Sequence, residues 1–181
     1  MEICDISRAG NPLGSVCRRL SDNRPRGNSY ARAVVSNIQS NIKIAREYTQ
    51  RVFNEHNPDL TAKYLTSTVK WHGGVLGTVE GIANVTGLLR GFIGALPDLK
   101  ATEQDVIAAD DRVAIRFVVE ATHKGNLFGI APTGRRVRWD AVDIYRVVDG
   151  MIAEEWAADD VTMILQQIGA YTLPMFSGKS P

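Results

Sequence analysis

The segment RWDAVDIYRVVDGMIAEEWAA, residues 138–158, has the pattern of a β-hairpin and decides the fold class. Branched and aromatic residues alternate with polar ones on both sides of Asp149-Gly150, which is typical of two half-buried antiparallel strands. Two stretches of similar composition precede the hairpin. Together they predict an antiparallel meander of four strands, at residues 100–109, 112–123, 135–148 and 151–158.

The chain before these strands is predicted to be mainly helical. Apolar residues recur there at helical spacing, with a short strand expected at Thr68–Trp71. Helices are expected at residues 36–56 and 58–65, from about Gly81 to Pro97, and at 161–168. Helices segregated to one side of an antiparallel sheet make an α+β fold. A curved sheet wrapped around the three N-terminal helices would form a cone whose open end is a ligand pocket.

The chain of 181 residues fits one domain with two tails. Residues 1–36 are rich in Gly, Ser, Asn and Arg and are expected to form a mobile extension. The domain is predicted over residues 37–170, followed by a loose tail at 171–181. Both cysteines, Cys4 and Cys17, lie in the extension. The domain therefore has no disulfide framework, cysteine nucleophile or cysteine-based zinc site.

Composition argues against several classes of function. The chain has 21 basic and 20 acidic residues, whereas a nucleic-acid binder draws its affinity mainly from excess positive charge. It has no apolar run of the roughly 20 residues that span a bilayer, and no apolar secretory core at its start. We therefore expect a cytoplasmic protein; the alternative is a cleaved transit peptide, because Arg and Ser are frequent near the start. The glycines of the Gly125–Gly134 loop join two strands, so no nucleotide cofactor is expected.

Asp143 and Glu155 are the first candidates for chemistry. A three-residue turn over Val148–Gly150, which we expect, would place them opposite each other on one face of the sheet. A two-residue turn would set Asp143 opposite Trp156 and separate the carboxylates by face. On one face of an apolar site they would repel each other and raise one pKa, which suits acid–base catalysis. The alternative is that both are solvated or held by nearby arginines.

His72 is the third candidate, because it ends a strand beside two glycines, where its ring could line a cavity mouth. The other histidines have structural explanations, since His56 ends a helix and His123 ends a strand. No second histidine lies at metal-binding spacing, so no metal site is expected.

Several stretches along the chain resemble one known family. They are Trp71-His72-Gly73, Glu80-Gly81-Ile82, Leu96-Pro97-Asp98-Leu99, Ala121–Gly125, Gly129–Arg135, Asp143–Arg146 and Leu165–Gly169. From about Ile38 to Gly169 the chain resembles the SnoaL-like polyketide cyclases and the related ester cyclases. The resemblance implies the cone-shaped α+β barrel shared with nuclear transport factor 2, ketosteroid isomerase and limonene epoxide hydrolase.

The resemblance also indicates which positions face the family's cavity. The aspartate base of the aromatic polyketide cyclases corresponds to Ala157, which cannot take a proton. The cyclases' pocket histidines correspond to Asp143 and Glu155, which again favours the three-residue turn. Either the acid–base role has moved by one cross-strand step, or the fold is used to bind a ligand.

We therefore expect a cofactor-free SnoaL-like enzyme that acts on a hydrophobic, polyketide-like small molecule. Asp143 and Glu155 would move protons, and His72 would orient the substrate. The candidates for substrate binding are Trp71, Arg116, Phe128, Trp139 and Tyr145. The alternatives are an epoxide- or ester-type hydrolase and a non-catalytic ligand-binding or dimerisation domain. Analogy with the family also predicts a homodimer or a larger homo-oligomer.

Overall fold

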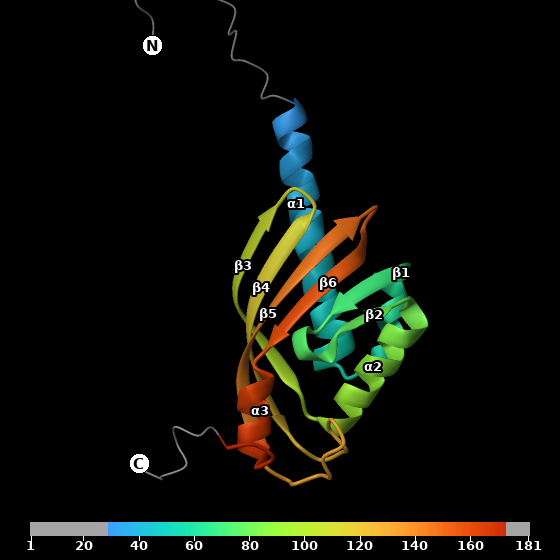
Figure 1. Ribbon diagram of the computed structural model, residues 1–181. Helices are drawn as coiled ribbons and strands as arrows, with labels where there is room; N and C mark the ends of the chain where they lie inside the picture. Colours follow the sequence, from blue (N-terminus) through green and yellow to red (C-terminus); the bar gives the residue numbers. More distant parts are fainter. Residues whose placement is uncertain (1–28, 173–181) are drawn as a thin grey trace, which may run out of the picture.

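The computed structural model describes residues 29–172 (Figure 1). Three α-helices, three short helical turns and six strands follow each other along the chain. In order they are α1 (Ser29–Tyr48), η1 (Thr49–Asn54), η2 (Pro58–Lys63), β1 (Leu65–His72), η3 (Gly74–Leu76), β2 (Thr78–Glu80), α2 (Ile82–Ala95), β3 (Lys100–Ala109), β4 (Arg112–Thr122), β5 (Arg136–Val148), β6 (Met151–Asp159) and α3 (Val161–Ile168). The predicted extension before Ser29 and the end of the predicted tail lie outside these residues.

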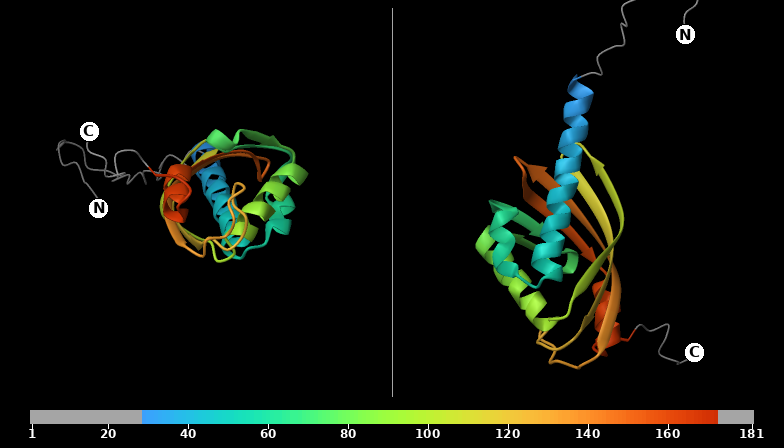
Figure 2. Two further views of the ribbon diagram at one scale, coloured as in Figure 1. Left: turned by 60° about the horizontal axis from the view of Figure 1, so that its bottom comes forward. Right: turned by 180° about the vertical axis from the view of Figure 1, so that it is seen from behind.

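The six strands form one curved sheet in the order β2-β1-β6-β5-β4-β3. The predicted α+β class and the four-stranded meander are confirmed. The sheet is nevertheless not purely antiparallel, because β1 joins β6 in parallel and carries the short strand β2 on its other edge. β2 was not predicted, because three residues are too few to show alternation. Figure 2 shows the unclosed sheet curving around α1, with α2 on the opposite side of the interior.

The helices differ from the prediction mainly at their ends. α1 begins at Ser29 rather than at Ser36, so the helix starts within the segment expected to be a mobile extension. After Tyr48 it continues as one wider π-helical turn to Asn54. The helix predicted at residues 58–65 is a single 3-10 segment. α2 ends at Ala95, close to its predicted end, because Pro97 prevents the helix from continuing.

Strict alternation on β4 separates the interior of the cone from its outer surface. Val113, Ile115 and Phe117 are buried on the inner face, whereas Arg112 and Arg116 between and beside them are exposed. Burying each such apolar side chain contributes about 1.5–3 kcal/mol to folding. The inner face therefore supplies the core and also the far wall of any cavity inside the cone.

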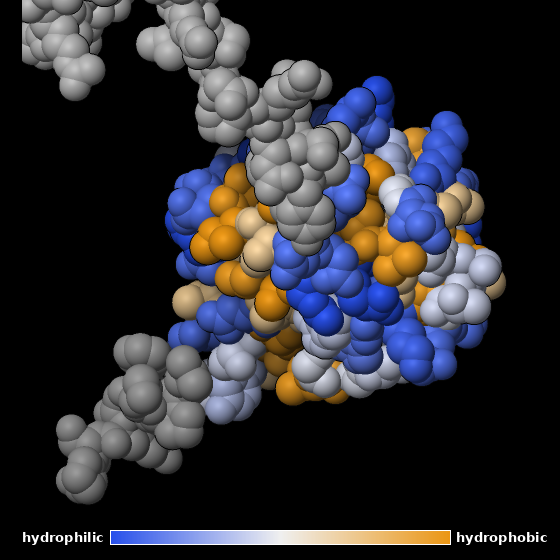
Figure 3. Space-filling model, turned by 90° about the horizontal axis from the view of Figure 1, so that it is seen from above, coloured by the Kyte–Doolittle hydropathy of each residue, from blue (hydrophilic) through white to orange (hydrophobic). Residues whose placement is uncertain are grey.

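Several large apolar side chains are exposed at the surface, among them Ile107, Val142 and Ile144 of the sheet. On the face seen from above, hydrophobic residues lie in several separate patches among hydrophilic ones (Figure 3). No helix within residues 29–172 has the length and hydrophobicity needed to cross a membrane.

Candidate functional site

The inner face of the sheet, α2 and η1 enclose a cavity of about 320 Å³. Its wall is mainly apolar, and it includes six aromatic side chains: Phe53, Trp71, Phe92, Phe117, Phe128 and Trp139. The loop between β4 and β5 crosses the open end of the cone (Figure 2). The cavity is large enough for a small organic molecule.

Three carboxyl groups are the ionisable groups among the described residues that line this cavity. Asp143 comes from β5, and Glu155 and Asp159 come from β6. Glu155 is only 1% exposed, whereas both aspartates keep partial access to the cavity. Within residues 29–172, no group of three His, Cys, Asp or Glu side chains is arranged to hold a metal ion.

The hairpin register that brings these carboxylates together differs from the prediction. Val148 pairs with Met151, so the turn has two residues, and the expected three-residue turn is wrong. Asp149 and Gly150 both have positive φ angles, 49° and 76°, as a type I′ turn requires. This turn type matches the right-handed twist of the flanking strands, which explains why it replaces the longer one.

A β-bulge in β6 then returns Asp143 and Glu155 to the same face of the sheet. Arg146 pairs with Glu154 and Val147 with Ile152, which leaves Ala153 as an extra residue on β6. The one-residue shift places Asp143 opposite Ala157 and Glu155 opposite Tyr145. Asp143 and Glu155 therefore share the inner face, as expected, but they are diagonal neighbours rather than a direct pair.

Each carboxylate accepts one hydrogen bond from a buried aromatic side chain. These bonds join Tyr145 Oη to Asp143 Oδ2 at 3.1 Å, Tyr48 Oη to Glu155 Oε2 at 3.2 Å and Trp139 Nε1 to Asp159 Oδ1 at 2.6 Å. The second oxygen of each carboxylate has no hydrogen-bond donor among the described residues. The aromatic donors thus fix the three groups and leave one oxygen of each available.

Burial and mutual repulsion favour the protonated forms of these acids. Burial, together with the charge of Asp159, raises the pKa of Asp143 to about 8. Burial and the charge of Asp143 raise the pKa of Glu155 well above its usual range, and burial also raises the pKa of Asp159. The cluster therefore keeps protons at neutral pH and can both accept and donate them.

Most of the predicted site residues lie at the cavity. Trp71, Phe128 and Trp139 line it together with the two predicted carboxylates. Tyr145 is fully buried behind Asp143 and is outside the cavity lining, so it acts on the carboxylate rather than on a ligand. Burial and the neighbouring carboxylates raise the pKa of Tyr145 well above its usual range, which keeps its hydroxyl protonated.

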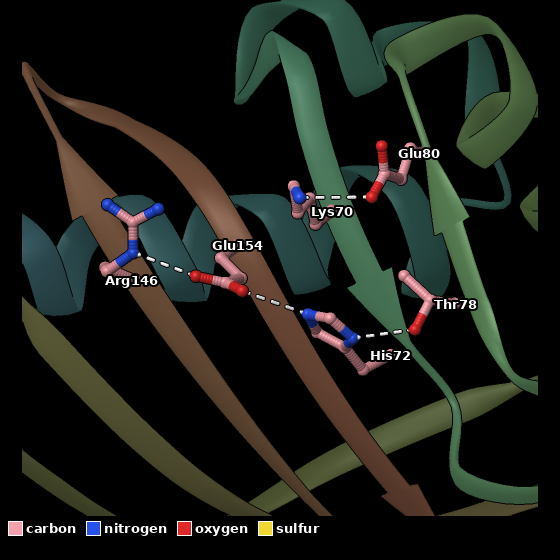
Figure 4. Close-up of polar contacts among 6 residues, drawn as sticks. All are labelled: Lys70, His72, Thr78, Glu80, Arg146 and Glu154. Carbon is pink, nitrogen blue, oxygen red and sulfur yellow. Dashed lines mark hydrogen bonds and ion pairs between the residues drawn. The ribbon is translucent and has the colours of Figure 1, made fainter.

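His72 lies on the outer face of the sheet. Its Nδ1 is 3.0 Å from Thr78 Oγ1 and its Nε2 is 3.0 Å from Glu154 Oε1 (Figure 4). Its ring stacks on Trp156. Arg146 Nε also donates to Glu154, at 3.1 Å. Because Trp71 points inward, its neighbour must point outward, and the geometry gives His72 no contact with a ligand in the cavity.

Arg116 is also separated from the cavity. It lies on the outer face of β4, half exposed, with its Nη2 2.7 Å from Asp105 Oδ2. Strand alternation between the buried Ile115 and Phe117 requires this orientation. The substrate-binding role expected for Arg116 therefore has no geometric support.

Two residues of the cluster were missing from the prediction. Asp159 follows Glu155 by four residues on β6, so period-two alternation would have placed both on one face had the strand not been ended at residue 158. Tyr48 belongs to the buried stripe of α1, where its apolar ring explains its position and hides the role of its hydroxyl.

The comparisons with known proteins agree with this geometry. The family described as SnoaL-like polyketide cyclase matches residues 43–168, which is most of the chain. The chain belongs to this family. No curated protein matches it.

Solved structures of other proteins share the fold. A candidate SnoaL-like polyketide cyclase from Jannaschia sp. CCS1 is 18% identical, with a TM-score of 0.69, over 74% of this chain and 94% of that one. AclR, a candidate hydroxylase from Streptomyces galilaeus, is 27% identical (TM-score 0.63) over 77% and 99%. IdmH, a candidate polyketide cyclase from Streptomyces antibioticus, is 28% identical (TM-score 0.61) over 72% and 99%.

Proposed function

We propose that this SnoaL-like protein is a cofactor-free enzyme that closes a ring in a polyketide or a similar polycarbonyl compound, with Asp143 as the base. The observation that carries the proposal is the position of Asp143 directly across from Ala157, inside an apolar cavity. Directly opposed side chains lie about 4.5–5.5 Å apart at their Cβ atoms. The small side chain of Ala157 leaves space in front of it. The carboxylate of Asp143 can therefore reach the space that a longer side chain at position 157 would fill.

The proposed reaction is an intramolecular aldol closure. The free oxygen of ionised Asp143 takes a proton from a carbon flanked by two carbonyls, and the resulting enolate attacks a carbonyl carbon of the same molecule. A protonated Glu155 then supplies a proton to the new alkoxide, which leaves one proton shared within the cluster. The apolar walls hold the chain of carbonyls in a folded conformation and exclude water from the enolate.

The pH dependence of the reaction follows from the raised pKa of the base. Asp143 must be ionised to act, and its pKa of about 8 means that the ionised fraction grows as pH rises through 8. We expect kcat/KM to increase about tenfold per pH unit below this value and to stop increasing above it, since this ratio reports the ionisation of the free enzyme. Initial rates measured between about pH 5.5 and 9.5 check this. A plateau that begins near pH 5 would contradict the assignment of the base.

Mass spectrometry of the products separates this function from its alternatives. Purified protein is incubated with a panel of aromatic and linear polycarbonyl esters. Aldol closure yields an isomer of unchanged mass, or one that has lost water on aromatisation, whereas a hydrolase adds one water. An unchanged compound that co-purifies with the protein would instead favour a ligand-binding domain, which the apolar cavity and Ala157 also fit.

We also propose that the protein is a homodimer or a larger homo-oligomer, by analogy with other curved-sheet proteins of this type. Light scattering at micromolar concentration tests this. A mass of one 19.9 kDa chain would be the contrary result.

A further inference from the structure

The charges and rings of the cavity wall point to the chemistry of the ligand. We propose that the cavity binds a hydrophobic organic cation, an amine that is protonated or alkylated and carried on a compact apolar body. This proposal rests on the proposed function. It adds that the substrate bound in the same cavity carries an ammonium group. The structure assigns the ammonium to the carboxylate side of the cavity and the apolar body to the aromatic side.

The first argument is the state of the carboxylate oxygens. Glu155 is 1% exposed, yet its Oε1 has no donor among the described residues. Asp143 Oδ1 and Asp159 Oδ2 also have no hydrogen-bond donor among the described residues. All three residues line the cavity, and when one of these carboxyl groups ionises, its free oxygen has neither a donor nor a compensating charge there. An ammonium group supplies up to three N–H donors as well as that charge.

The second argument is the separation of positive and negative groups across the sheet. Among the described residues that line the cavity there is no Lys, Arg or His. Three arginines of the neighbouring strands lie on the outer face and are each paired there with an acid. These pairs are Arg116 with Asp105, Arg138 with Glu120 and Arg146 with Glu154. The described part of the chain therefore offers the inner carboxylates no cation.

The third argument is the aromatic wall. Phe92 and Trp139 pack edge to face with ring centroids 6.3 Å apart, and Trp71 and Phe117 also line the cavity. Trp139 donates its Nε1–H to Asp159, which fixes its ring beside a carboxylate. The faces of Trp and Phe rings attract cations, most strongly where water is excluded. Carboxylates and aromatic faces together favour a cation over a neutral molecule of equal shape.

Three probes of one shape and different charge test the proposal by binding alone. They are 1-naphthylmethylamine, which is a cation at neutral pH, the neutral 1-naphthalenemethanol and the anion 1-naphthylacetate. Their naphthyl fluorescence and isothermal titration calorimetry report the dissociation constants with the full-length protein. We expect the amine to bind at least about tenfold more tightly than the alcohol, and the acetate to bind least. An alcohol or acetate that binds as well as the amine overturns the proposal, as does a failure of all three to bind at millimolar concentration.

Variants locate the binding in the cavity. Asp159→Asn keeps the shape of the side chain and an acceptor for Trp139, and it should remove most of the amine's advantage while leaving the alcohol unchanged. Glu155→Gln is the second variant if the first fails to fold, and it has the same expected result. Asp140→Asn, on the exposed outer face of β5, is the matched control and should bind like the wild type. An amine advantage that survives in Asp159→Asn and Glu155→Gln contradicts the proposal.

The proton balance of binding adds an independent readout. Tyr48 and Tyr145 stay protonated, so the groups that face the ammonium and can release protons when it binds are Asp143, Glu155 and Asp159. A bound cation favours their ionised forms, and about one proton should be released on binding at pH 7. Calorimetry in phosphate and in Tris measures this release, and proton uptake is the contrary outcome. If the protein binds the amine no more tightly than the alcohol, the proposed acid–base function is not contradicted, because the mass of the reaction product tests that function separately.

Discussion

Replacing Asp143 with Asn is expected to lower kcat for ring closure by about a hundredfold to ten-thousandfold, the usual contribution of a general base. Asn has the same shape and can still accept the hydrogen bond from Tyr145, so the cavity should keep its form. Its amide cannot take a proton from carbon. The measurement is the initial rate of product formation, with KM determined in parallel to show that substrate still binds.

A matched variant keeps this result interpretable. Asp140→Asn lies three residues earlier on the same strand but on the exposed outer face, so kcat should stay within about twofold of wild type. Glu155→Gln should also lower kcat strongly if the carboxylates act as one unit. Full activity in Asp143→Asn would show that another group is the base, and Asp159 would then be the next candidate.

The same Asp143→Asn substitution is expected to stabilise the folded protein at high pH. Asp143 loses its proton near pH 4 in the unfolded chain but near pH 8 in the folded protein. Between these values the folded state binds more protons, so the free energy of unfolding of the wild type falls as pH rises. Because Asn has no proton to lose, the variant lacks this fall in the free energy of unfolding. The variant should gain on the order of a few kcal/mol over the wild type at about pH 8 and nearly nothing at about pH 4.

Urea unfolding at both pH values checks this effect. The exposed control Asp140→Asn should change stability by no more than about 0.5 kcal/mol at either pH. If the wild type and Asp143→Asn keep the same difference in unfolding free energy at both pH values, Asp143 is not a buried, protonated acid. An inactive but more stable variant would be the signature of a site whose charged groups oppose folding.

The architecture could be predicted because it depends on periodic patterns. β4 alternates buried and exposed residues over eleven positions, and the buried stripe of α2 recurs at helical spacing. The parallel pairing of β1 with β6 could not be predicted in this way, since it joins segments more than eighty residues apart. The start of α1 at Ser29 was missed because the segment before Ser36 was grouped with the Gly-, Ser- and Arg-rich residues that precede it, although Tyr30 and Val34 continue the helical spacing of Ile38.

The site was predicted only in part, because its details depend on single residues. Ala153 forms a bulge that no alternation pattern indicates, and it decides which residue faces Asp143. His72 was placed at the cavity on the basis of its neighbours, although alternation from Trp71 already directs it outward. Asp159 could have been found by extending the same alternation one residue further.

The most direct test of the account is the pKa of Asp143 itself. Carbon-13 NMR of the side-chain carboxyl groups is followed from about pH 3 to 10, and the Asp143 signal is assigned by its loss in Asp143→Asn. The account predicts that this carboxyl titrates near 8, and that the titration moves to lower pH in Asp159→Asn, because the neighbouring charge is removed. A carboxyl that titrates near 4 in the wild type would contradict the account, since Asp143 would then be an ordinary solvated acid.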